Sequence, residues 1–79
     1  MSFSSNEKIL CDFFIEREGK GILKVIRDLD LIDEGILDSL DIVSLAAYLQ
    51  KNFNKKIDVT EPKILKAFHK FEDIMKIIE

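Results

Sequence analysis

The residues best suited to chemistry lie together in the middle of the chain, at positions 35–41 with the sequence GILDSLD. Asp38 is suited to be the N-cap of a helix, because its carboxylate can accept amide protons of the first turn. Asp41, three positions on, adds a second negative charge at the positive end of that helix. Ser39 is then expected in the first turn, with an exposed hydroxyl beside amide groups that have no partner within the helix. Such a position suits a serine that receives and carries a phosphate group.

Other chemistry finds little support in the sequence. Asp38 and Asp41 could in principle hold a metal ion, but two carboxylates make a weak site, and their role at the helix terminus is the preferred interpretation. His69 is the single histidine and has no cysteine near it, so the ligand set of a zinc site is missing. No base is visible beside Ser39, which makes a serine hydrolase the weakest interpretation. The chain is therefore not expected to be an enzyme or to bind a metal.

The helix that must position Ser39 is predicted from about residue 38 to residue 53. Asn54 follows it, and asparagine suits the left-handed conformation at a helix end. Three lysines gather at that end, where the helix dipole favours positive charge. Apolar residues recur at helical spacing and define the face expected to enter the core, namely Ile42, Leu45, Ala46, Leu49 and Phe53.

A first helix is predicted over residues 5–17, where apolar residues recur every three or four positions. Ser4 and Glu7 have the spacing of a capping box at its start. Gly19 and Gly21 are expected to end it, since glycine readily takes left-handed geometry. Cys11 is interpreted as a small core residue rather than a reactive thiol.

The remaining segments predict a second short helix, a loop and one or two further helices. Ile22, Val25, Ile26 and Leu29 have helical spacing, whereas residues 28–37 read as a loop whose apolar residues face the domain and whose acids face water. A short third helix is expected from Pro62, capped by Thr60 or Glu61. A last helix is expected over residues 71–78, although one continuous helix over residues 62–78 is also open. The prediction is an all-α, four-helix domain with a long loop between its first two helices.

Composition bounds the function further. The 79 residues allow one domain, 1–79, and the 47% apolar and 34% charged residues are typical of a globular protein. We expect a cytoplasmic protein, because the sequence has no secretion signal, no apolar run that could cross a membrane, and one cysteine, which excludes an internal disulfide. Residues 28–41 carry six acids and no base, which disfavours nucleic acid and favours basic partner surfaces.

The stretch DLIDEGILDSLDIVSL at residues 30–45, continued to Phe53 and Ile57, resembles the acyl and peptidyl carrier protein family. About half of the chain carries the resemblance clearly, and the rest agrees in helix order and length. It implies a four-helix bundle of that type, in which Ser39 carries a covalent 4'-phosphopantetheine arm. A separate phosphopantetheinyl transferase would attach the arm from coenzyme A with magnesium. The thiol of the arm, not Cys11, would then hold an acyl or aminoacyl cargo as a thioester, while the carrier itself catalyses nothing.

The resemblance also implies roles for the residues around Ser39. Asp38 matches the acid that presents the serine to the transferase, and Leu40, Asp41, Val43 and Ala47 match positions that contact partner enzymes. The implied partners are the transferase, an acyl-loading ligase or transferase, and downstream enzymes that use the acyl group. Apart from the resemblance, we expect by default a monomer that binds neither nucleic acid nor membrane.

The sequence departs from the carriers of fatty-acid synthesis, which usually have several acids along this helix. The counterparts of those acids here are Ser44, Gln50 and Lys51, so steering of partners by charge should differ. The form of the motif is more similar to stand-alone carriers of dedicated pathways, such as polyketide, nonribosomal peptide or aminoacyl carriers. The alternative is a small helical interaction domain without a prosthetic group, in which Ser39 only starts a helix.

Overall fold

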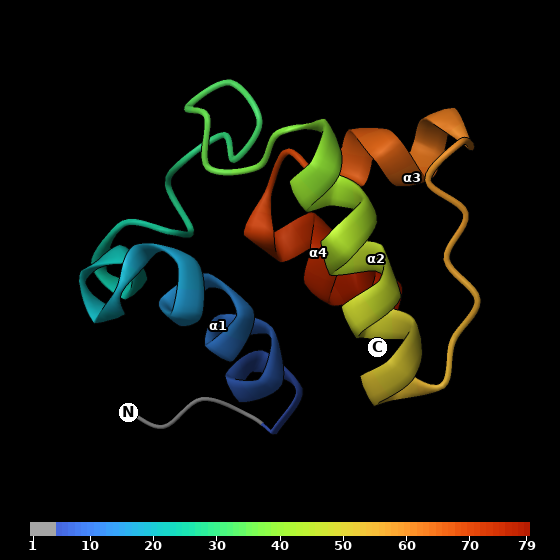
Figure 1. The fold of residues 1–79 in the computed structure, drawn as a ribbon, viewed down its shortest axis with the longest axis horizontal. Coiled ribbons are helices and arrows are strands. Elements are labelled where there is room, and N and C mark those ends of the chain that lie inside the picture. Colours follow the sequence, from blue (N-terminus) through green and yellow to red (C-terminus); the bar gives the residue numbers. More distant parts are fainter. Residues whose placement is uncertain (1–4) are drawn as a thin grey trace.

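The computed structural model describes residues 5–79, which contain four α-helices: α1 (Ser5–Glu18), α2 (Ser39–Phe53), α3 (Pro62–Ala67) and α4 (Phe71–Ile78). A short 3-10 helix, η1 (Lys20–Lys24), follows α1, and this part of the chain contains no strand. The all-α class and the long connection between the first two α-helices are thus confirmed (Figure 1). No helix among these residues has the length and apolar character needed to cross a membrane.

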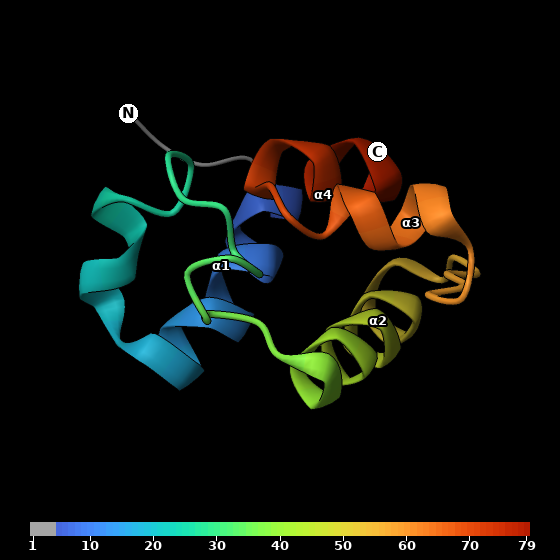
Figure 2. The same ribbon diagram turned by 90° about the horizontal axis from the view of Figure 1, so that it is seen from above.

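The helices enclose one apolar core, with α1 packed against both α2 and α4 (Figure 2). Aromatic rings join these elements, since the rings of Phe14 and Phe71 lie with their centroids 6.5 Å apart. Cys11 is only 2% exposed, and burial raises the pKa of its thiol, so its predicted place in the core is confirmed. Burying one large apolar side chain stabilises the fold by about 1.5–3 kcal/mol, so this cluster is the main source of stability.

The first predicted helix is confirmed within a residue at its end. Ser4 of the predicted capping box lies outside the described residues. Gly19 ends α1 with a φ of 85°, a left-handed value that glycine takes without steric cost. Gly21 does not act as a helix end, because it lies inside η1. The second short helix was expected around residues 22–29 and is instead a 3-10 helix that begins and ends earlier.

The segment at residues 28–38 is a loop, as predicted, and it is anchored by leucines. Leu31 and Leu37 are completely buried, and the Leu37 amide donates to the Leu31 carbonyl at 2.8 Å. Most acids of the loop are exposed, but Asp30 is half-buried and hydrogen-bonded, which corrects the expectation that all of them face water. This segment ends at Asp38 and thereby fixes where α2 begins.

Helix α2 has the predicted bounds and the predicted buried face. Four of the five residues expected in the core are buried, and Phe53 is half-buried. The helix ends at Asn54, whose φ of 53° and ψ of 42° are left-handed, as the sequence predicts. The hydroxyl of Tyr48 donates to the Ile9 carbonyl at 2.6 Å and so joins α2 to α1.

The structure decides between one and two helices at the C-terminal end in favour of two. The His69 carbonyl accepts a hydrogen bond from the Leu31 amide at 2.7 Å, so it is used by the loop rather than by a continuous helix. Glu61 occupies the N-cap position of α3 but makes no side-chain cap bond, and the Thr60 hydroxyl donates to Asp58 instead. Leu65 is 42% exposed, so the apolar residues of α3 are not all covered by the core.

Candidate functional site

Ser39 is the first residue of α2 and is exposed, as the sequence leads one to expect. Asp38 precedes it as the N-cap in an extended conformation. The Asp41 amide donates to Oδ1 of Asp38 at 2.9 Å, and the Asp38 amide donates to Oδ2 of Asp41 at 3.2 Å. This reciprocal capping box fixes the start of the helix and holds the backbone of Ser39 in one conformation.

The capping box leaves two amide groups available beside the serine. The first four amides of a helix, here those of residues 38–41, have no carbonyl partner within it. The box satisfies the amides of Asp38 and Asp41, so the amides of Ser39 and Leu40 remain to interact with solvent or a ligand. They lie at the positive end of the helix dipole, where an anionic group is stabilised.

Asp41 is held by a second contact that the sequence did not predict. Arg17, near the end of α1, forms an ion pair with Oδ1 of Asp41 and stacks over the Phe13 ring at 4.7 Å from its centroid. The Asp41 side chain is only 19% exposed, and both of its oxygens have partners. Asp41 therefore presents less free charge to a partner than its sequence position suggests. The two residues are 24 positions apart, and no local pattern reveals such a pairing.

An apolar surface adjoins the serine on α2. Leu40 is 78% exposed and Val43 is 58% exposed, more than the exposed Val25 and Leu65 elsewhere in the described residues. Ala47 is also exposed, and its spacing from the other two places all three along one side of the helix. We name Leu40, Val43 and Ala47 the α2 apolar strip. Neighbouring exposed apolar residues of this kind often mark an interaction surface.

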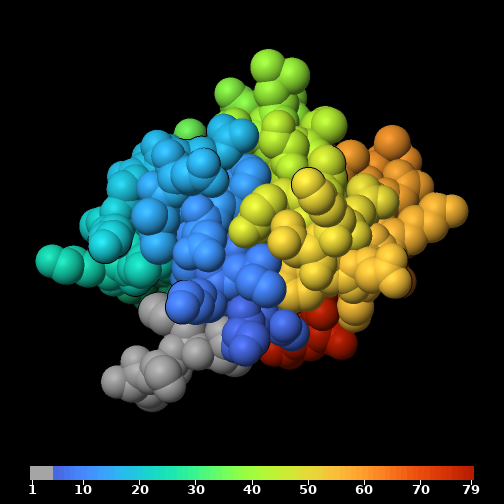
Figure 3. Space-filling model, turned by 60° about the horizontal axis from the view of Figure 1, so that its bottom comes forward, coloured from blue at the N-terminus to red at the C-terminus, as the bar shows by residue number. Residues whose placement is uncertain are grey.

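Beside the strip, a groove of about 480 Å³ runs between α1 and α2, which meet on the face in Figure 3. Ala47 and Ser44 line it from α2, and Phe13 lines it from α1. Charged side chains of both signs also line it, including Arg17 and Lys51. The loop that precedes α2 is therefore acidic, whereas the surface beside the groove carries charges of both signs.

His69 is paired with Asp30 and not with Ser39. Its Nδ1 lies 2.8 Å and 3.0 Å from the two carboxylate oxygens of Asp30. The pKa of Asp30 is lowered, first by the hydrogen bond from the Asp33 amide and then by His69. The pair fastens the loop before Ser39 to the junction of α3 and α4. The sequence offers no sign of it, because 39 residues separate the partners.

Comparison of the chain with protein-family models, with curated proteins and with solved structures found no match.

Proposed function

We propose that this chain is an acyl or aminoacyl carrier protein, modified on Ser39 with a 4'-phosphopantetheine arm. The proposal depends on one observation above all, which is the exposed hydroxyl-bearing residue at the first position of α2, directly after a capped Asp38. A transferase must reach this oxygen from solvent and must meet it in a fixed orientation. Exposure satisfies the first need, and the capping box supports the second.

The surroundings of Ser39 also suit the phosphate of the arm. A phosphodiester on this oxygen would lie beside the amides of Ser39 and Leu40, at the positive end of α2. The neighbouring carboxylates would oppose it, but Asp38 is engaged with the Asp41 amide, and the Arg17 guanidinium offsets the charge of Asp41. The arm supplies the thiol that carries the cargo, and the residues of this chain hold and present its attachment point.

The α2 apolar strip is proposed as the contact surface for partner enzymes. When a partner covers Leu40 and Val43, their apolar surface is removed from water, and this hydrophobic burial favours binding. The exposed acids of the preceding loop would meet basic groups of the transferase and of the loading and acyl-using enzymes. Farther along α2, Lys51 favours a partner with an acidic group at that point. The carrier itself would act as a monomer and catalyse nothing.

The decisive test is transfer of the arm in solution. The purified chain is incubated with coenzyme A, magnesium and a phosphopantetheinyl transferase of broad specificity, and the intact mass is then measured. We expect a mass increase of one phosphopantetheine group in the wild-type chain and none in Ser39→Ala. Ser44→Ala is the matched control, because Ser44 is an exposed serine of the same helix, and this variant should be modified like the wild type.

A helical interaction domain without a prosthetic group is the second candidate, because the exposed Leu40 and Val43 would serve it equally well. It predicts no change in mass with any transferase. Modification that persists in Ser39→Ala would contradict the carrier proposal as well, since the arm would then be attached elsewhere.

A further inference from the structure

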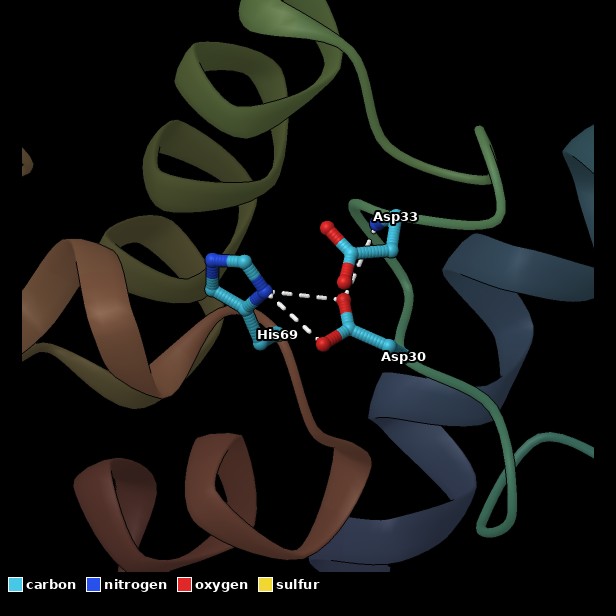
Figure 4. A group of neighbouring side chains, drawn as sticks. All are labelled: Asp30, Asp33 and His69. Carbon is cyan, nitrogen blue, oxygen red and sulfur yellow. Dashed lines mark hydrogen bonds and ion pairs between the residues drawn. The ribbon is translucent and has the colours of Figure 1, made fainter.

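Away from the Ser39 surface, three metal-ligating side chains meet where the loop crosses the junction of α3 and α4 (Figure 4). Asp30 and Asp33 come from the loop, and His69 comes from the junction. One ligand atom of each lies within 4.8 Å of the others. Asp33 turns its carboxylate toward that of Asp30, and the imidazole of His69 faces the same point (Figure 4).

Backbone contacts hold these side chains together independently of any ligand. The Leu31 amide donates to the His69 carbonyl at 2.7 Å, which joins the two segments beside the cluster. The Asp33 amide donates to Oδ1 of Asp30 at 2.9 Å and fixes the turn between the two acids. Oδ2 of Asp30 contacts only His69 among the hydrogen bonds in residues 5–79, so it retains capacity to accept a ligand. The cluster is thus organised in advance.

A purely structural hydrogen bond explains only part of this arrangement. It accounts for Asp30 and His69, which are 28% and 35% exposed at their side chains. It does not account for Asp33, because two carboxylates that face each other repel when both are ionised. A cation between them would remove that repulsion, and the imidazole nitrogen would supply a ligand that a simple acidic patch lacks.

We propose that Asp30, Asp33 and His69 form a binding site for a divalent first-row transition ion such as Zn²⁺. Ligand atoms lie about 2.0–2.2 Å from such an ion, so neighbouring ligands of a tetrahedral site lie roughly 3.3–3.6 Å from each other. The three ligand atoms lie within 4.8 Å of one another, and an ion at this point would take the place of the proton that Nδ1 of His69 now donates to Asp30. Imidazole together with carboxylate favours zinc-like ions over Mg²⁺ and Ca²⁺, which prefer oxygen ligands alone.

Such an ion would cross-link the loop that leads to Ser39 with the junction of α3 and α4. These segments are already joined by the Leu31 amide and the His69 carbonyl, so the ion strengthens an existing contact. The ion binds the folded chain and not the unfolded one, and it therefore stabilises the fold by mass action. This site does not involve Ser39, so a test of the metal site does not depend on whether the chain is a carrier.

The test is a titration of the unmodified chain with ZnCl₂, followed by isothermal calorimetry, and with CoCl₂, followed by the visible absorption of bound Co²⁺. We expect one equivalent to bind and Zn²⁺ to raise the midpoint of thermal unfolding. Asp33→Asn should weaken binding by about tenfold or more, since even loss of an outer-shell partner typically costs 10–100-fold in metal affinity. This variant keeps the hydrogen bond of Asp30 with His69, so its fold should persist.

Glu34→Gln is the matched control, because Glu34 is an exposed acid adjacent in sequence that lies outside the cluster, and it should bind like the wild type. The proposal is overturned if Zn²⁺ shows no saturable binding at millimolar concentration. It is equally overturned if Asp33→Asn and His69→Gln both retain wild-type affinity while circular dichroism shows that they are folded, because the ion would then lie elsewhere.

Discussion

The two segments that flank α2 differ in how firmly they are held. The preceding one, residues 28–38, is fixed by two fully buried leucines, by the pair of Asp30 with His69, and by the capping box. The following one, residues 54–61, buries only Ile57 and is shaped by the left-handed Asn54, by the local bonds between Asp58 and Thr60, and by one long hydrogen bond of 3.4 Å from Lys55 Nζ to the Ile77 carbonyl. The end of α2 that bears Ser39 is therefore the more constrained one.

This difference agrees with what each segment would present if the chain is a carrier. The C-terminal end of a helix needs only a residue that tolerates left-handed geometry. Asn54 meets this need by itself, because asparagine adopts that conformation readily. Under the carrier proposal, a serine that a partner enzyme must meet needs a fixed orientation, and the local capping box supplies only part of it. Contacts with α1, through Arg17, and with the junction of α3 and α4, through His69, supply it from a distance.

The largest expected effect separates two leucines that lie three positions apart on either side of Ser39. Leu37 is fully buried, whereas Leu40 is 78% exposed. Leu37→Ala should lower the free energy of unfolding by about 2–5 kcal/mol, because it leaves a cavity in the core. Leu40→Ala should change it by no more than about 0.5 kcal/mol. Urea denaturation followed by circular dichroism measures both.

Leu37→Met conserves volume and should cost less than about 1.5 kcal/mol, so it shows whether packing or side-chain identity matters at this position. Under the carrier proposal, Leu40→Ala should also slow transfer of the arm to Ser39, although it leaves the fold intact. Equal losses of stability in Leu37→Ala and Leu40→Ala would contradict the contrast between an anchored loop and an exposed strip.

A smaller effect compares the two ends of α2. Asp38→Ala removes the N-cap and should cost about 1 kcal/mol. Asn54→Ala places a side chain that disfavours left-handed geometry at the other end and should cost about 1 kcal/mol as well. Despite equal losses of stability, only Asp38→Ala should reduce the rate of arm transfer, because only that end presents Ser39. Denaturation curves and the time course of the mass change together test this.

Two conservative variants serve as controls. Asp38→Asn keeps an oxygen that can accept the Asp41 amide, and Asn54→Gly keeps the left-handed conformation, so each should remain within about 0.5 kcal/mol of the wild type. If Asn54→Ala slowed transfer as much as Asp38→Ala, the rate would be reporting general stability and not the presentation of Ser39.

The sequence predicted what depends on neighbours along the chain. The bounds of α2, the cap at Asp38, the left-handed Asn54 and the burial of Cys11 all follow from short-range spacing and residue type. The break between α3 and α4 could not be derived from the sequence, because it depends on a distant hydrogen bond in which the Leu31 amide donates to the His69 carbonyl. The exposure of Leu65 could not be derived either, because a helix of six residues leaves its orientation to tertiary packing.

In the candidate site, too, features set by neighbouring residues were predictable and contacts between distant residues were not. The position and exposure of Ser39 were predictable from the cap that precedes it. The ion pair of Arg17 with Asp41 was not, although it alters how much charge Asp41 offers to a partner. The cluster of Asp30, Asp33 and His69 was missed because each residue is unremarkable in its own segment. Contacts between residues far apart in sequence leave no trace in a single sequence without a fold.

The smallest expected effect concerns acid stability and again compares the two flanks. The pKa of Asp30 is lowered by the Asp33 amide, and the pKa of Asp58 is lowered by the hydroxyl of Thr60 and then by its amide. A carboxyl whose pKa is lower in the folded state stabilises the fold above its unfolded pKa, near 3.9, and this contribution is lost as the pH falls through the folded value. Stability should therefore decline as the pH falls below about 5.

Replacing either acid with asparagine removes the titrating group and should make this decline less steep. Both effects should be small, because Asp58 is exposed and the half-buried Asp30 is still partly screened by solvent. Asp30→Asn should also lower stability at neutral pH more than Asp58→Asn, because Asp30 joins its loop to His69 across the fold, whereas Asp58 bonds only within its own turn. Urea denaturation at a series of pH values from 3 to 7 measures the slope and the offset. An unchanged slope in Asp30→Asn would show that its hydrogen bonds do not persist in solution, and the preceding flank would then be no better anchored than the following one.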